Sequence, residues 1–262
     1  MTNEPMTIEP VKELTFGNLR MQVYPSREAA GAAAARDAAA AIREQAAGRE
    51  ALGVIFATGA SQMAMLAALT AIRGIPWDKV QGFHMDEYIG ISPDHPASFR
   101  RYLRERLTSQ VQMRNFRGVN GNNDPAEECR SYAEALRVAE PQLCLLGIGE
   151  NGHLAFNDPG EADFQDLADM KVAHLDDACR TQQVAEGWFS RLDEVPREAL
   201  TLTIPALLRV PKLIASVPGL RKAAIVRRTA LEPVSTACPA TILRSHPDAT
   251  VYLDLDSAAQ LP

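Results

Sequence analysis

The chain has 262 residues, of which 46% are hydrophobic and 23% charged, a composition typical of a globular protein with room for one large core. The net charge of -6 and the lack of a basic block argue against non-specific nucleic-acid binding. No apolar run approaches the roughly 18 residues of a membrane span, and the N-terminus lacks the basic and apolar regions of a signal peptide. The four cysteines lie far apart and form no metal-ligand pair, so we expect reduced thiols in a cytoplasmic protein.

Strand-like and helix-like segments alternate along the chain after a loose polar lead-in over residues 1–15. Residues 19–24 alternate apolar and polar positions, as a half-buried strand does. An alanine-rich helix is expected over residues 27–47, with Ser26 as its N-cap and Gly48 ending it. These alanines suit packing against a sheet or against a second copy of the chain, so a homo-oligomer is one expectation.

The same alternation continues to the C-terminus. Further strands are expected over residues 52–57, 80–84, 143–146, 171–175, 199–204, 213–217 and 251–254. Further helices are expected over residues 62–72, 96–107, 125–140 and 177–189, with one turn over 205–209 and a last helix from 222. This alternation predicts an α/β fold with an open, mostly parallel sheet and helices on both faces, a three-layer, Rossmann-like architecture. We find neither a repeat nor a linker, so residues 16–262 are expected to form a single domain.

A glycine-rich turn follows the strand over residues 143–146 and reads Gly-Ile-Gly-Glu-Asn-Gly-His-Leu-Ala-Phe-Asn-Asp-Pro over 147–159. In the simplest interpretation, His153 is a hydrogen-bonded histidine of a tight turn. The glycines also fit the dinucleotide fingerprint Gly-x-Gly-x-x-Gly, but the breaker residues 157–160 leave no room for the helix that must receive a pyrophosphate. The third interpretation is a catalytic loop in which His153 and Asp158 perform acid–base chemistry.

Three other strand ends carry groups suited to a ligand. The first is the turn of Thr58, Gly59, Ala60 and Ser61. Its helix start offers free amides to an anion, and simple capping by Ser61 is an equal alternative. Asp86 and Glu87 end a second strand, where neighbouring side chains point to opposite faces, so one is expected to face a ligand and the other to make structural contacts. Lys222 adds a cation beside a third strand end.

Taken together, these motifs resemble the glucosamine-6-phosphate deaminase (isomerase) family, whose relatives include the 6-phosphogluconolactonases. The matching segments occur in the expected order from about residue 19 to residue 254. They are Ala-Thr-Gly-Ala-Ser over 57–61, Phe-His-Met-Asp-Glu-Tyr over 83–88, His-Pro-Ala-Ser over 95–98, the glycine-rich turn over 147–159, Lys-Ala at 222–223, Pro-Ala-Thr-Ile-Leu over 239–243 and His-Pro at 246–247. Lactonase relatives typically have Asp-Gly-His-Thr-Ala-Ser in this turn, so Leu-Ala-Phe-Asn over 154–157 favours the deaminase branch.

The resemblance implies conversion of an amino-sugar 6-phosphate, such as glucosamine 6-phosphate, to fructose 6-phosphate and ammonia. Such chemistry needs one base at C2 and a separate proton shuttle at the ring oxygen, and neither a metal nor an organic cofactor. Asp86 matches the family's proton-abstracting aspartate, and His153 its ring-opening histidine. The turn from Thr58 to Ser61 matches the one that holds phosphate, and Lys222 matches the lysine that helps to neutralise it.

Three positions depart from the family pattern. Asn151 stands where the best-known members have aspartate, and it is expected to orient the imidazole of His153 by a hydrogen bond without offsetting its charge. Asp158 stands where glutamate is usual, so its shorter side chain is expected to lose reach toward the histidine. The family's phosphate-gripping arginine precedes an aromatic pair, but here Gly187 precedes that pair, and Arg180 is the candidate substitute.

Two other functions stay open at this stage. A 6-phosphogluconolactonase-like hydrolase would use His153 to activate water. A sugar-phosphate sensor would bind its ligand without turnover, because Asp158 and the altered phosphate grip would no longer support the reaction. All three functions share a small sugar phosphate as the partner.

Overall fold

The structure is a computed structural model that describes residues 9–262, so the first eight residues of the expected lead-in lie outside the described residues. Its large sheet consists of β1 (Lys12–Phe16), β2 (Leu19–Tyr24), β3 (Leu52–Phe56), β4 (Val80–His84), β6 (Asn115–Arg117), β7 (Leu143–Leu146), β10 (Lys212–Ser216) and β11 (Ala249–Asp254). The strand order is β1-β2-β11-β10-β7-β3-β4-β6. All pairs are parallel except β1 with β2, which confirms the mostly parallel sheet.

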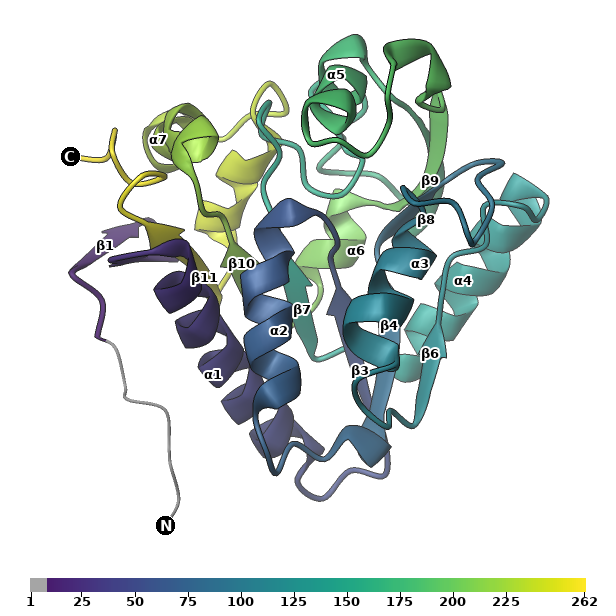
Figure 1. Ribbon diagram of the computed structural model, residues 1–262, viewed down its shortest axis with the longest axis horizontal. Coiled ribbons are helices and arrows are strands. Elements are labelled where there is room, and N and C mark those ends of the chain that lie inside the picture. Colours follow the sequence, from purple (N-terminus) through teal and green to yellow (C-terminus); the bar gives the residue numbers. More distant parts are fainter. Residues whose placement is uncertain (1–8) are drawn as a thin grey trace.

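Helices cover both faces of this sheet (Figure 1). They are α1 (Arg27–Ala46), α2 (Met63–Ala71), α3 (Phe99–Leu103), α4 (Pro125–Ala139), α5 (Asp177–Ala185), α6 (Ile204–Leu208) and α7 (Ala223–Leu231). Helices α1, α2 and α3 lie on one face, whereas α4, α6 and α7 lie on the other (Figure 1). The three-layer architecture predicted from the alternation of segments is therefore confirmed.

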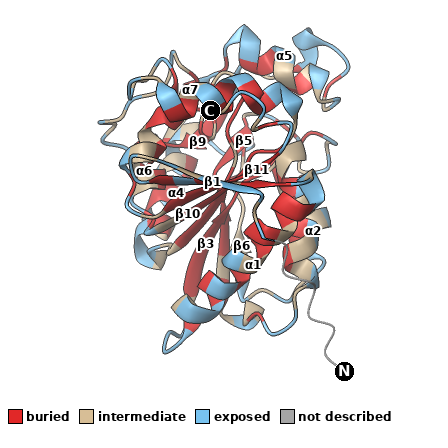
Figure 2. Cartoon of the chain, turned by 90° about the vertical axis from the view of Figure 1, so that its left-hand side faces the viewer, coloured by how far each residue is buried: buried red, intermediate tan, exposed pale blue. Residues whose placement is uncertain are grey.

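The sheet is buried because apolar side chains leave its strands in both directions. In β3, Val54 packs in a cluster with Ile42 of α1, while its neighbour Ile55 packs in the opposite cluster with Leu136 of α4 and Val226 of α7. Figure 2 shows the central strands buried beneath exposed helix faces. Burial on both faces explains why these strands read as continuous apolar runs in the sequence. Within the described part of the chain, no helix has the length and apolar character needed to cross a membrane.

Helix α1 confirms the predicted N-cap, since Oγ of Ser26 accepts a hydrogen bond from the amide of Ala29 at 3.2 Å. Its alanines are mostly buried against the sheet and against α2. A Cβ added to Gly31 would lie 2.7 Å from the Cβ of Ala64, so small residues let the two helices approach closely. These buried alanines therefore provide no surface for a second copy of the chain.

The N-terminal segment differs from the prediction, because part of the expected lead-in forms strand β1 (Lys12–Phe16). It pairs antiparallel with β2 through a tight turn at Gly17, whose φ of 61° suits glycine. β1 is an edge strand with mostly exposed or half-buried side chains. It therefore lacks the apolar signal by which the other strands were predicted.

A second sheet was not predicted. It consists of β5 (Asp86–Tyr88), β8 (Met170–His174) and β9 (Glu198–Leu202), paired antiparallel in the order β5-β9-β8. The expectation that β8 and β9 belong to the parallel sheet is wrong, since hydrophobic patterning reports burial and says nothing about the pairing partner. The chain passes from the large sheet to this one at Met85, between β4 and β5. This crossing places Asp86 where the two sheets meet.

Candidate active site

One pocket of about 250 Å³ lies at the carboxyl ends of β3, β7 and β10. Its walls come from the turns after these three strands, from the start of β5 and from α5. The predicted site residues among its lining are Thr58, Gly59, Ala60, Ser61, Asp86, His153 and Lys222. The structure thus brings together in one place three strand ends that are separated by up to 160 positions in the sequence, as expected for a parallel sheet.

Two turns of the pocket have nearly the same backbone. Gly59 has φ 96° and precedes the 3-10 turn η1 (Ala60–Gln62) that leads into α2. Gly219 has φ 99° and precedes the 3-10 turn η5 (Leu220–Lys222) that leads into α7. Neither helix start has a side-chain cap, so the alternative of simple capping by Ser61 is wrong. Uncapped helix starts leave backbone amides available for an anion.

Side-chain hydrogen bonds hold these two turns together across the end of β7. Ser216 donates its hydroxyl to the carbonyl of Ser61 at 3.0 Å, and Gln62 Nε2 donates to the carbonyl of Ser216 at 3.3 Å. A Cβ on Gly147 would lie 2.9 Å from that Nε2. The first glycine of the motif therefore gives room for the link between the two turns.

Lys222 is the buried cation of the pocket, with 8% of its surface exposed. It forms no hydrogen bond or ion pair with another described residue, and it lines the pocket beside the two turns. Burial lowers the pKa of its ammonium group, and the nearby carboxylates of Glu186 and Glu150 oppose that shift. A bound anion would raise this pKa again, because an opposite charge favours the charged form.

Asp86 and Glu87 point to opposite sides, which confirms the division of roles predicted for them. Asp86 lines the pocket and is 7% exposed. Burial raises the pKa of its carboxyl to about 8, and the negative charge of Glu87 adds to the shift. A carboxyl with this pKa is poised for proton transfer near neutral pH.

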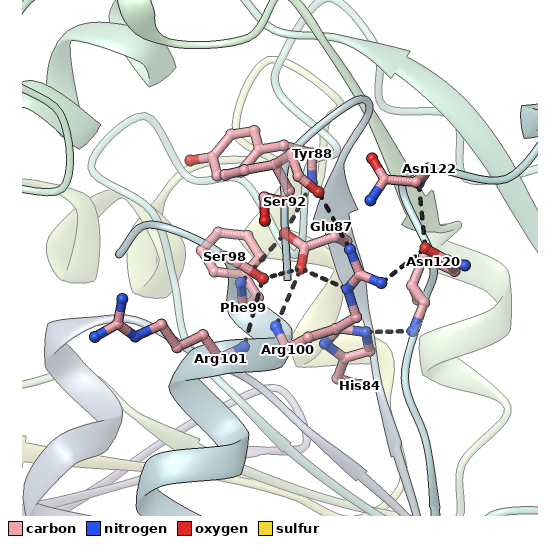
Figure 3. A network of polar contacts seen from close by, with 12 residues as sticks. His84, Glu87, Tyr88, Ser92, Ser98, Phe99, Arg100, Arg101, Asn120 and Asn122 are labelled. Atoms are coloured by element: carbon pink, nitrogen blue, oxygen red, sulfur yellow. Dashed lines mark hydrogen bonds and ion pairs between the residues drawn. The ribbon is translucent and has the colours of Figure 1, made fainter. Parts of the chain in front are cut away.

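Glu87 faces away from the pocket and binds the beginning of α3 (Figure 3). Its fully buried carboxylate accepts hydrogen bonds from the hydroxyl of Ser98 at 2.8 Å and from the amides of Phe99 at 3.2 Å and Arg100 at 3.0 Å. The Arg100 guanidinium in turn donates to Oδ1 of Asn120 at 2.7 Å. Because Ser98 is the N-cap, the helix begins at Phe99, three residues later than predicted. This network fixes the backbone next to Asp86.

The glycine-rich turn supplies a histidine–aspartate pair. His153 Nδ1 lies 2.7 Å from Oδ1 of Asp158, so the predicted loss of reach is wrong. A short bridge between Leu154 and Asn157, with Ala155 at φ 51°, curls the turn and returns Asp158 toward the ring. A Cβ on Gly149 would come within 2.3 Å of the imidazole. Gly149 and the curl of the turn therefore both serve to position the histidine. This agrees with the rejection of the dinucleotide fingerprint.

Asn151 acts on Asp158 instead of on the imidazole, which corrects the role expected for it. Its Nδ2 donates to Oδ1 of Asp158 at 2.9 Å, and its Oδ1 accepts from the backbone amide of His153 at 3.0 Å. Burial by itself raises the pKa of Asp158, but the hydrogen bonds from His153 and Asn151, together with the nearby Cys179 thiol, outweigh it and hold the pKa below its usual value. Asp158 is therefore an ionised acceptor for the Nδ1–H group.

Cys179 of α5 lies next to the pair formed by His153 and Asp158. Ligand atoms of His153, Asp158 and Cys179 lie within 4.8 Å of one another, the arrangement in the described residues closest to a metal site. Burial and the neighbouring Asp158 raise the pKa of the Cys179 thiol well above its usual value. A protonated thiol is a poor metal ligand but a suitable donor to a carboxylate. The geometry thus fits a protonated thiol packed beside the Asp158–His153 pair better than a metal centre.

A family model for glucosamine-6-phosphate isomerases and 6-phosphogluconolactonase matches residues 25–252. The chain belongs to this family. It is 35% identical over 213 residues to a glucosamine-6-phosphate deaminase of Exiguobacterium sibiricum, covering 81% of this chain and 82% of the relative. It is 36% identical over 194 residues to the deaminase of a Geobacillus species, covering 72% and 75%.

Solved structures of the family share the fold. A monomeric glucosamine-6-phosphate deaminase superposes with a TM-score of 0.85 at 28% identity, covering 92% of this chain and 99% of that one. A 6-phosphogluconolactonase of Trypanosoma brucei superposes with a TM-score of 0.77 at 17% identity, covering 96% and 100%. At such low identity the lactonase comparison establishes the common fold alone.

Arg180 does not take the place of the family's phosphate-gripping arginine, so this prediction is wrong. The side chain is 3% exposed, lies outside the pocket lining and donates to the carbonyls of Leu192 at 2.6 Å and Val195 at 3.2 Å. It fastens α5 to the segment that precedes β9. Gln182 and Gln183 of α5 and Glu186, which follows the helix, line the pocket instead.

Sequence reasoning also missed several charged residues of the pocket, which are Arg27, Glu150, Glu186 and Arg221. Arg221 and Glu150 form an ion pair, with Nε 3.5 Å from Oε1. Arg221 stands next to Lys222 in the family motif, so proximity in sequence was an available signal. Arg27 had none, because it is the first residue of a helix that is recognised by the alanines it buries.

Proposed function

We propose that this protein converts glucosamine 6-phosphate, or a closely related amino-sugar 6-phosphate, to the ketose 6-phosphate and ammonia. The observation that carries the proposal is the meeting of Asp86, His153 and two anion-binding turns in a single pocket. Relatives named as glucosamine-6-phosphate deaminases, 32–36% identical to this chain, support the choice of substrate. The free state of all four cysteines supports a reducing, cytoplasmic location.

His153 is proposed to open the sugar ring. Its Nδ1–H is held by Asp158 at 2.7 Å, which leaves Nε2 as the ring nitrogen for the substrate. Nε2 takes the proton of the C1 hydroxyl and delivers it to the ring oxygen, so that the C1–O5 bond breaks and the aldehyde forms. The histidine ends in its starting state, and the ionised carboxylate stabilises the transient imidazolium.

Asp86 is proposed to move the hydrogen from C2 to C1. Its carboxylate removes the C2 proton to give an enolamine and returns that proton to C1, which produces an imine at C2. Water then adds to the imine and the C–N bond breaks. Ammonia is released, and C2 becomes the ketone carbon. The ammonium group of the arriving substrate favours the ionised carboxylate, because an opposite charge lowers the pKa that burial has raised to about 8.

The phosphate is proposed to bind at the turn from Thr58 to Ser61, against the ammonium of Lys222. Uncapped amides and a buried, unpaired cation both favour an anion there. Binding at this remote group fixes the reacting carbons against Asp86 and His153. All the steps are proton transfers and an addition of water, so we propose neither a metal nor an organic cofactor.

The two alternatives are less well supported. The sensor function depended on Asp158 and on the altered phosphate grip, and the 2.7 Å contact between His153 and Asp158 removes the first of these reasons. The lactonase function is supported by structures below 25% identity, which indicate a fold and no activity. The test is an assay of ammonia release from glucosamine 6-phosphate beside hydrolysis of 6-phosphogluconolactone. We expect ammonia release and only background lactone hydrolysis, and the reverse result would reject the deaminase function.

A further inference from the structure

The proposed phosphate site has one buried cation where the family pattern has two. A glycine, Gly187, stands before the aromatic pair, and the Arg180 guanidinium is occupied by backbone carbonyls. A phosphate monoester carries close to two negative charges at neutral pH. Lys222 alone would leave about half of that charge without a direct partner.

Arg27 lies at the edge of this site. It is the first residue of α1 and lines the pocket together with both anion-binding turns. Its Nη2 is 3.0 Å from the position that a Cβ on Gly219 would occupy. The guanidinium therefore rests against the second turn, three residues from Lys222, in space that glycine leaves open.

No described residue forms a hydrogen bond or an ion pair with the side chain of Arg27. Arg221, the other arginine of the pocket, differs because Glu150 is its ion-pair partner. Among the described residues, Arg27 and Lys222 are thus two cations without a partner, one lying against Gly219 and the other ending the turn that follows it. An unpaired guanidinium offers five N–H donors in a planar fork, which suits the oxygens of a phosphate.

The parts that carry Arg27 and its turn are held in place. Ser26 caps α1 through the amide of Ala29 at 3.2 Å, which fixes the backbone next to Arg27. The carboxylate of Asp254 accepts from the amide of Gly219 at 2.9 and 3.0 Å, which fixes the turn. A site organised before the ligand arrives loses less conformational entropy on binding.

We infer that Arg27 binds the substrate phosphate together with Lys222 and takes the place of the arginine that this chain lacks in α5. The inference rests on the proposed function for the identity of the phosphate ligand. It gives Arg27 a role in selecting phosphorylated sugars over free sugars, since a free amino sugar offers this guanidinium no anion. Arg27 touches no reacting carbon in this account, so it is a substrate-binding residue.

The test compares the wild type with Arg27→Gln, Arg27→Lys and the control Arg130→Gln. Arg130 is an exposed arginine of α4 outside the pocket, so its replacement removes the same charge elsewhere. For Arg27→Gln we expect KM for glucosamine 6-phosphate and Kd for inorganic phosphate to rise by about ten- to a hundredfold, with kcat nearly unchanged. Arg27→Lys should recover part of the loss, and Arg130→Gln should match the wild type.

Binding of inorganic phosphate is measured by calorimetry, so this part of the test does not depend on turnover. If the wild type releases no ammonia but phosphate binding weakens in Arg27→Gln alone, the proposed function fails and the inference stands. If phosphate binds equally to the wild type and to Arg27→Gln, or does not bind to the wild type, the inference is overturned whatever the activity. Equal thermal midpoints of all four proteins would show that the comparison is between folded proteins.

Discussion

The imidazole Nδ1 of His153 lies 2.7 Å from Oδ1 of Asp158, although only four residues separate them in a glycine-rich turn. Such a short loop reaches back because Ala155 adopts a φ of 51° and Leu154 pairs with Asn157. The pair fixes the ring and leaves Nε2 as the ring nitrogen that can meet a ligand in the pocket. It also shows how a family position that usually holds glutamate accommodates aspartate.

Replacement of Asp158 tests the value of this contact. Asp158→Asn should lower kcat by about 10²-fold or more, because a neutral amide stabilises neither the required tautomer nor the imidazolium. Asp158→Glu should also lose activity even though glutamate is usual in the family, since a further methylene must be fitted into a fully buried position. Steady-state kinetics on both variants provide the measurement. Full activity of Asp158→Glu would show that the curled turn is not specific for aspartate.

Cys179 is expected to act through Asp158. Cys179→Ala removes the thiol that lies beside this carboxylate and helps to lower its pKa, and it should lower kcat by roughly two- to tenfold, the effect of one modest polar contact. Cys179→Ser keeps a donor and should retain most of the activity. The pH profile distinguishes positioning from packing, because loss of the donor should also shift the profile of kcat. A Cys179→Ala enzyme with wild-type kinetics would show that Cys179 does not act through Asp158.

The pH dependence of kcat/KM should report Asp86 in the free enzyme. A base must be deprotonated to act, and burial raises the pKa of this carboxyl to about 8. Therefore kcat/KM should increase with pH and level off above about pH 8. The measurement is a pH series with substrate well below KM. A plateau already reached at pH 5 would mean that the working base is an ordinary exposed carboxylate.

The buried carboxyl of Asp86 should also lower the free energy of unfolding at high pH. Its pKa rises from 3.8 in the unfolded chain to about 8 in the fold, so the folded state binds one more proton between these values. The stability contribution of this group is complete below pH 4 and is lost as the pH rises to about 8. Asp86→Asn removes that dependence, so at pH 9 its thermal midpoint should exceed that of the wild type. Parallel midpoint curves for the two proteins from pH 4 to pH 9 would contradict this expectation.

The large sheet could be predicted because its central strands are buried on both faces and leave continuous apolar runs, as in residues 143–146. The second sheet could not, since β8 and β9 pair antiparallel with each other and β9 pairs antiparallel with the three-residue β5. Pairing direction depends on where the chain travels between strands, which patterning does not encode. Within β5, the strand period correctly predicted that Asp86 and Glu87 face opposite sides, and the resemblance to the family indicated that Asp86 is the one in the site.

Residues of the candidate site could be predicted where they belong to a sequence motif. They could not be predicted where a side chain reaches the pocket from a distant part of the sequence. Asp86, His153 and Lys222 line the pocket as expected. Arg180 seemed a suitable cation by position, but its helix turns the guanidinium toward two carbonyls before β9. Arg27 was missed because its neighbourhood reads as an alanine-rich helix and its place beside Gly219 is a tertiary feature.

Asp86 is proposed to be the base in an amino-sugar-phosphate deaminase, and a comparison of the wild type with Asp86→Asn tests this role. Ammonia release from glucosamine 6-phosphate is measured at pH 8 for the wild type and for Asp86→Asn. We expect steady ammonia release by the wild type. In the variant, the rate of release should fall by at least about 10²-fold while the substrate still binds. Comparable release by both proteins would show that Asp86 is not the base, and a silent wild type would contradict the deaminase function itself.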